Sequence, residues 1–142
     1  MISQREQIIG EVLQRCQNAV NPFRVLRQPT LAVPRELTPV LIMAVVSDTP
    51  VRLLNELAER ELVLRLISHV RDPGAGFAMA DMLLCQAHAA LLRDASLGGL
   101  ALGIVELEAD YQAEDADGEA IAIPATYRIT YRTLVSDISQ QG

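Results

Sequence analysis

The chain contains no lysine, and its charge is unevenly distributed. All 12 basic residues are arginines, against 18 acids. Seven of the acids lie in the base-free segment 106–119, so the rest of the chain is almost neutral, with 11 acids and 12 arginines. The net charge of −6 is therefore local. An acidic, lysine-free domain is poorly suited to gripping phosphate backbones, and we expect no specific nucleic-acid binding.

Cysteines and long hydrophobic runs are also scarce. Cys16 and Cys85 are too few for a disulfide framework, and we expect both to be reduced core residues. The longest uncharged apolar stretches, such as 37–47, have about half of the ~20 residues that a membrane span needs. Glu6 and Glu11 interrupt the region where a signal peptide needs an apolar core. These absences predict a soluble, intracellular product without a membrane partner.

No catalytic motif is visible either. Nucleophilic catalysis needs a nucleophile, a base and an orienting group, but the chain has only two histidines, and neither has a recognisable setting. The "GAG" at 74–76 lacks the spacing and the lysine of a phosphate-binding loop. We therefore expect a protein that is not an enzyme and that uses no cofactor.

One group of residues supports an alternative reading. Asp81, Cys85 and His88 have i, i+4 and i+7 spacing on a predicted helix, with His69 as a possible fourth ligand, and zinc accepts such groups. The simpler interpretation is that His88 is a core histidine with one satisfied nitrogen. A small metal-binding or enzymatic domain built on these residues stays the alternative.

The first half of the chain predicts one helix and two strands. An amphipathic helix over 3–20 begins with a capping box of Ser3 and Glu6, and Asn21-Pro22 ends it. A short extended piece at 23–27 precedes a strand at 39–48 that is apolar on both faces, as in a buried strand. A second strand, at about 60–71, alternates between two faces, and the segment before it reads as strand or loop.

A second helix, at about 76–93, is apolar nearly all round. One face carries the predicted core stripe of Phe77, Ala80, Leu84, His88 and Leu91. The opposite side carries Met79, Met82, Leu83, Ala89 and Ala90. A helix of this kind is buried on two sides or meets a partner. We predict a subunit interface through Met79, Met82, Leu83 and Ala90.

The last 40 residues predict a long β-hairpin. From 125 to 133 the sequence alternates, with Tyr127 on an apolar core face and Arg128 and Arg132 on a polar face. We predict that this polar face contacts a neighbouring subunit or lines a channel. Pro124 indicates a bulge or an edge strand.

The turn of this hairpin lies in "EDADGE", and the pattern favours a three-residue loop, 116–118, in which Gly118 supplies the left-handed residue. That loop pairs Val105 with Ile129, Glu106 with Arg128, and Leu107 with Tyr127, which leaves one face wholly apolar. In the same register Glu106, Glu108 and Asp110 share the polar face. A two-residue turn mixes the faces.

The order helix, strands, helix, hairpin predicts a single α+β domain over 1–142. We expect a mostly antiparallel β-sheet with two α-helices packed on one face and a long C-terminal β-hairpin.

The order and local texture resemble the tail terminator (minor tail protein U-like) family of tailed bacteriophages. The features are a short N-terminal amphipathic helix, a proline-broken extended region, the strand "ERELVLRLISHVRD", the helix "ADMLLCQAHAALLRDASLGGLAL" and a hairpin that closes on "YRITYRT". The segment from this helix to "LGG" and the strand "YRITYRT" carry most of the resemblance, which spans roughly residues 3–136. These motifs are not catalytic, so no functional residue is transferred. Neck and other tail-completion proteins share a similar arrangement, and a small dimeric adaptor of the same fold outside any virion is a further possibility.

The resemblance implies a structural protein of the virion tail, present in the host cytoplasm during assembly. It implies a homo-oligomeric ring, a hexamer, that caps the head-proximal end of the tail tube and stops its polymerisation. The ring would contact the tail tube protein and head–tail connector proteins, and DNA would pass through it. In such a ring we expect Glu106, Glu108 and Asp110 to face the channel, where carboxylates repel phosphate.

Overall fold

The computed structural model describes residues 1–28, 33, 35–72, 74–110, 112–113 and 120–142. In chain order the elements are α1 (Gln4–Val20), β1 (Arg24–Arg27), the 3₁₀ helix η1 (Arg35–Leu37), β2 (Val40–Leu54), β3 (Leu57–Arg71), α2 (Gly76–Leu92), β4 (Gly103–Ala109), β5 (Gln112–Ala113) and β6 (Ala120–Leu134). The predicted α+β class is confirmed. The predicted hairpin loop, 116–118, lies outside the described residues. No helix in the described ranges is long and apolar enough to cross a membrane.

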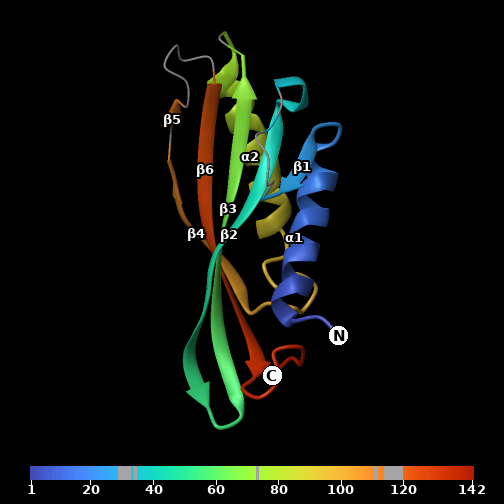
Figure 1. Cartoon of the computed structure of the whole chain (residues 1–142), viewed down its shortest axis with the longest axis vertical. Helices are drawn as coiled ribbons and strands as arrows, with labels where there is room; N and C mark the ends of the chain where they lie inside the picture. The colour runs from blue at the N-terminus through green and yellow to red at the C-terminus, as the bar shows by residue number, and fades with distance from the viewer. Residues whose placement is uncertain (29–32, 34, 73, 111, 114–119) are drawn as a thin grey trace.

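The sheet has the strand order β1-β2-β3-β6-β4, and β5 also pairs with β6. Among the described residues, β1 and β2 run parallel, and the other strand pairings are antiparallel. Both long helices lie on one face of the sheet, as predicted (Figure 1). The end of the β2–β3 hairpin projects beyond the helices (Figure 1). We call its residues 50–60 the distal hairpin.

Helix α1 forms largely as the sequence predicts. The Ser3 hydroxyl accepts a hydrogen bond from the Glu6 backbone N–H at 3.1 Å, which caps the first turn. The Glu6 carboxylate pairs instead with Arg27 at the end of β1, at 2.8 Å, so the helix cap and the first strand are tied together.

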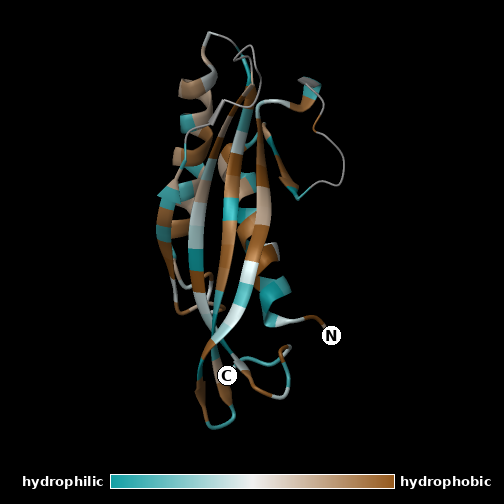
Figure 2. Cartoon of the chain, turned by 60° about the vertical axis from the view of Figure 1, so that its left-hand side comes forward, coloured by the Kyte–Doolittle hydropathy of each residue, from teal (hydrophilic) through white to brown (hydrophobic). Residues whose placement is uncertain are grey.

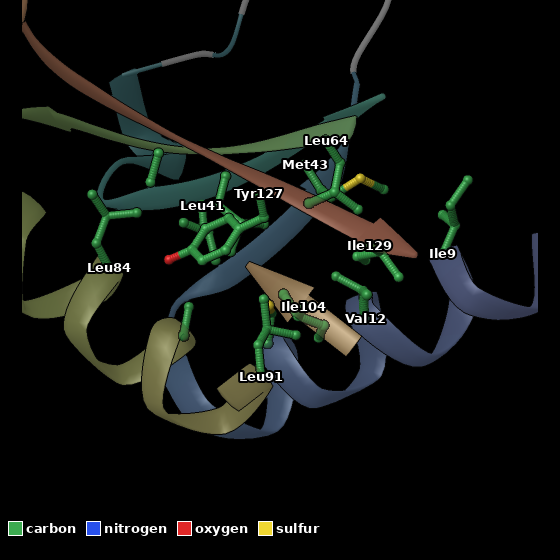
Figure 3. Packing of buried hydrophobic residues seen from close by; sticks show 14 of the residues in the cluster. Ile9, Val12, Leu41, Met43, Leu64, Leu84, Leu91, Ile104, Tyr127 and Ile129 are labelled. Carbon is green, nitrogen blue, oxygen red and sulfur yellow. The ribbon is translucent and has the colours of Figure 1, made fainter. Parts of the chain in front are cut away.

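The core lies between the sheet and the two helices (Figure 3). Leu62, Leu64 and Leu66 of β3 are fully buried on the helix side, as their alternation predicts. They pack in one cluster with residues of α1, α2 and β6, among them Ile9, Val12, Leu84, Leu91, Tyr127 and Ile129. Full burial of one such aliphatic side chain contributes about 1.5–3 kcal/mol, so this cluster holds the helices on the sheet.

The buried face of helix α2 agrees in part with the predicted core stripe: Ala80, Leu84 and Leu91 are buried, but the face is rotated toward Leu83 and Ala87 and away from Phe77. Its buried residues are Gly76, Ala80, Leu83, Leu84, Ala87 and Leu91. Leu83 is 0% exposed and belongs to the core, so its assignment to a subunit interface is wrong, whereas Phe77 is largely exposed. Gly76 allows the close approach, because a Cβ there would lie 2.8 Å from Ile121 Cγ1. When a helix is apolar nearly all round, its sequence pattern does not identify which face is buried.

The final hairpin also differs in register. The predicted alignment holds near the turn, where Glu108 pairs with Thr126, but an irregularity between Glu106 and Glu108 shifts it by one residue. Glu106 is therefore opposite Tyr127, and Arg128 is opposite Val105, so the predicted Glu106–Arg128 pair is wrong.

Of the two alternatives that Pro124 indicates, the hairpin contains the bulge, in β4 between Glu106 and Glu108, and β6 is not an edge strand, because it pairs with β3 on one side and with β4 and β5 on the other. The Pro124 carbonyl accepts a hydrogen bond from the Asp110 N–H at 2.9 Å. Backbone N and O of one strand residue point to the same side, so the missing N–H of Pro124 faces the point between β4 and β5. The proline is tolerated where the neighbouring strand is interrupted.

Candidate functional site

The sheet has one face that the two long helices leave uncovered, which we call the open face. Along the long strands, hydrophilic and hydrophobic residues alternate (Figure 2). On the open face this alternation places partly exposed side chains of both kinds, among them Ile42, Ala44, Val63, Ile67, Thr130, Arg65, Arg128 and Arg132. A half-apolar sheet face of this kind is suited to contact with another protein.

The predicted arginine ladder lies on this open face. Arg132 forms an ion pair with Glu59 of β3 at 3.8 Å, and Arg65 donates a hydrogen bond from Nε to the Thr126 hydroxyl at 3.3 Å. Arg128 lies between Val63 on one side and Val105 on the other. The arginines of the open face are therefore surrounded by acidic, hydroxyl and apolar side chains.

The bulge in β4 divides the acids that were predicted to share one face. Glu106 is opposite Tyr127 and lies on the helix side, so its predicted place beside Glu108 and Asp110 is wrong. Glu108 and Asp110 line a hollow of about 230 Å³ on the open face, together with Arg65. The two signs of charge are therefore mixed there.

On the helix side, a cleft of about 200 Å³ lies between α2 and the strands β4 and β6. His88 Nδ1 is 2.8 Å from the Tyr127 hydroxyl and 3.3 Å from Glu106 Oε2. Burial, and then the negative charge of Glu106, raises the pKa of Tyr127 well above its usual value. Asp81 and Cys85 also line the cleft.

This arrangement gives little support to the metal-site alternative. His88 has one satisfied nitrogen, as the core-histidine interpretation expects, because Nδ1 contacts the Tyr127 hydroxyl, but its side chain is only partly buried. Among the described residues no three His, Cys, Asp or Glu side chains are grouped to hold a metal ion. His69 follows Ile67, which lines the open-face hollow, at strand spacing, so His69 points away from the helix-side cleft. Cys85 is exposed and makes no hydrogen bond to His88 in the described structure.

A buried charged cluster that the sequence did not reveal lies where the distal hairpin leaves the body. Asp48 Oδ2 accepts hydrogen bonds from Arg5 Nη1 and from the Tyr131 hydroxyl, both at 2.7 Å. Arg60 Nε lies 3.5 Å from Asp48 Oδ1. Burial, and then the hydrogen bond to Asp48, raises the pKa of Tyr131 to about 12. The cluster joins α1, β2, β3 and β6 at one point.

The remaining predicted interface residues of α2 differ in their exposure. Met82 is 39% exposed and Met79 is partly buried against the core. Ala90 lines a groove of about 430 Å³ between the two helices, together with Arg15, Arg93 and Asp94. Of the four predicted residues, Met82 is the one that presents a large apolar side chain to solvent.

No family model and no curated protein matches the sequence. A search of solved structures does find matches, among them a chain of the structure titled "Virion of native gene transfer agent (GTA) particle". The alignment has a TM-score of 0.52 and 16% sequence identity, and it covers 84% of this chain and 90% of that chain. At this identity, the match shows that the two chains share a fold.

Proposed function

We propose that this chain is a non-enzymatic structural protein of a phage-like particle, and more specifically a tail terminator. In this role it forms a homo-oligomeric ring, a hexamer, on the head-proximal end of the tail tube. The observation that carries the proposal is the fold shared with a virion chain over 90% of that chain's length. The family resemblance of the strand, helix and hairpin motifs supports the finer assignment.

The exposed apolar surface supports a role in assembly. Large apolar side chains on the distal hairpin and on β4 are exposed: Val51, Leu53, Leu54, Val105 and Leu107. These side chains leave much apolar surface in water, which is typical of proteins that bind other proteins. The proposed partners are further copies of this chain, the tail tube protein and head–tail connector proteins.

We propose that the open face lines the channel of the ring. Its described charges are nearly balanced, with Arg52, Arg65, Arg71, Arg128 and Arg132 against Glu59, Glu61, Glu108 and Asp110. A wall with balanced charges has no surplus of basic side chains to neutralise DNA phosphates and release their counterions. DNA therefore passes through the channel without being bound. We therefore retain the prediction that Glu108 and Asp110 face the channel. We assign Arg128 and Arg132 to the channel wall as well, rather than to the subunit interface.

The oligomeric state tests the proposal. Native mass spectrometry of the purified protein is expected to give a species of six times 15.5 kDa, about 93 kDa. Negative-stain electron microscopy of the same sample is expected to show rings with a central opening. A strict monomer at high protein concentration contradicts the proposal.

A further inference from the structure

The sheet ends in two strand edges that nothing in the described structure covers. In the described structure, β1 pairs with β2 over Val40–Met43. Two residues further along β2, the Val45 backbone N–H donates a hydrogen bond to the Gln28 side chain. From 46 to 54, β2 is paired on its β3 side alone. At the other border of the sheet, β4 (Gly103–Ala109) is paired on its β6 side alone. Such edges are templates for further strands.

We infer that β4 of one copy pairs with the 46–54 edge of β2 in the next copy, so that the sheets of neighbouring subunits join. This inference rests on the proposed ring and names its subunit contact. The strand directions agree with it. Along the order β2-β3-β6-β4 every neighbour is antiparallel, so β4 runs opposite to β2. A second copy placed beside the first in the same orientation therefore continues the antiparallel pattern.

The side chains at the two edges match in hydrophobicity. On β4, Val105 and Leu107 are 48% and 45% exposed, and on β2, Val46 and Val51 are 48% and 47% exposed. Exposed β-branched and aliphatic side chains on facing strands form stabilising cross-strand pairs. Joining the edges brings these four side chains to the seam between the two copies.

The charges at the two edges are opposite. Beside the β2 edge the one acid, Asp48, is already bound by Arg5 and Arg60, and Arg52 is exposed. The β4 edge carries acids and no base: Glu106, Glu108 and the adjoining Asp110. Arg52 and Glu108 lie on the open face of their strands, because Arg52 pairs with Glu59 and Glu108 pairs with Thr126. Both side chains therefore lie on the same side of a joined sheet.

These two edges are different surfaces of one molecule, so the contact is head-to-tail. A head-to-tail contact forms a closed ring when its rotation closes. Pro50 and the irregularities at Val45/Ser47 and Pro50/Arg52 interrupt the β2 edge. Prolines and bulges limit the addition of arbitrary strands to an edge. The partner strand is therefore selected by how well its side chains and charges match those of the β2 edge. Strand β4 of a second copy provides this match.

Disulfide trapping tests the contact. In a Cys85→Ser background, Val51→Cys and Val105→Cys are introduced together and the protein is oxidised mildly. The expected result is a ladder of covalent multimers that ends at the size of the ring. The control pair replaces Val51→Cys with Gln14→Cys, on the solvent side of α1, and no ladder is expected from it.

A charge exchange provides an independent readout that does not depend on cysteine geometry. Arg52→Glu is expected to reduce the oligomer fraction at least severalfold, and adding Glu108→Arg is expected to restore it. Arg93→Glu, an exposed change at the end of α2, is expected to have no effect. If rings form but neither the ladder nor the rescue appears, the strand contact is wrong and the proposed function stands. If the unmodified protein never forms an oligomer, both are contradicted.

Discussion

At the scale of single residues, the buried carboxylate of Asp48 holds the base of the distal hairpin against α1 and β6, through its hydrogen bonds to Arg5 and Tyr131. The Ser3 cap could be predicted because its partner lies three residues away. The Asp48 cluster could not, because its hydrogen-bond partners Arg5 and Tyr131 lie 43 and 83 residues away in the sequence. From the sequence alone, an aspartate directly after an apolar strand is interpreted as a solvent-exposed residue at the end of that strand. The order of strands in the sheet is needed to see which side chains surround it.

The first prediction concerns this buried carboxylate. Asp48 is 5% exposed, so Asp48→Asn leaves Arg60, itself mostly buried, without its counter-charge. We expect a loss of about 3–5 kcal/mol in the free energy of unfolding, measured by urea denaturation. Glu6→Gln, which removes the exposed pair with Arg27, is the matched control and is expected to cost about 0–1 kcal/mol. Equal small losses for both variants would show that the buried cluster is not structural.

The second prediction concerns pH. Because the pKa of Tyr131 is raised from 10 to about 12 in the folded state, its stabilisation is complete below pH 10 and is lost as pH rises toward 12. In that range we expect the unfolding free energy of the unmodified protein to fall more steeply than that of Tyr131→Phe. The difference in slope is at most about 1.4 kcal/mol per pH unit. Parallel curves from chemical denaturation at pH 9 to 12 would contradict the assignment.

At the scale of elements, the strands were predictable and the helix orientation was not. Strict alternation identifies the buried face of β3, where Leu62, Leu64 and Leu66 lie in the core. Helix α2 lacks a polar side, so its pattern could not place Leu83 correctly. Pro124 indicates a bulge in the hairpin but not its position, and the bulge at Leu107 of β4 moves Glu106 to the other face of the sheet.

The third prediction uses two neighbours on α2. Met82 is partly exposed and Leu83 is fully buried, so the same helix offers a surface variant and a core variant. Met82→Glu is expected to change the unfolding free energy by less than about 0.5 kcal/mol while it weakens assembly. Leu83→Ala is expected to cost about 2–5 kcal/mol. Unfolding of the Met82→Glu monomer, seen by circular dichroism, would show that this side is buried within the subunit.

At the scale of the whole molecule, the class of fold was predictable from the order of elements, and the positions of the strands in the sheet were not. The order β1-β2-β3-β6-β4 brings the C-terminal strand β6 beside β3, which no local pattern specifies. That order is what creates the open face and its two uncovered edges. Surfaces that serve assembly follow from the order and register of strands, so a sequence without a catalytic motif says little about them.

The fourth prediction concerns the channel. The unmodified ring is expected not to bind a short DNA duplex at ~0.1 M salt, because its wall is nearly neutral. Glu61→Arg removes one negative charge and adds one positive charge per copy on the open face, and it is expected to produce salt-dependent binding in fluorescence anisotropy. Gln14→Arg with Asn18→Arg adds the same charge to the solvent side of α1 and serves as the control. Equal binding by both variants would place the open face outside the channel.

The length of the tails tests the central claim most directly. Electron microscopy of particles from a strain that carries this gene gives the distribution of tail lengths, with and without the gene. A tail terminator stops tube growth and provides the surface on which the head docks. The account therefore predicts uniform tails with heads when the gene is present, and long, variable, headless tubes when it is deleted. Tails of unchanged length with heads attached in the deletion strain would contradict it.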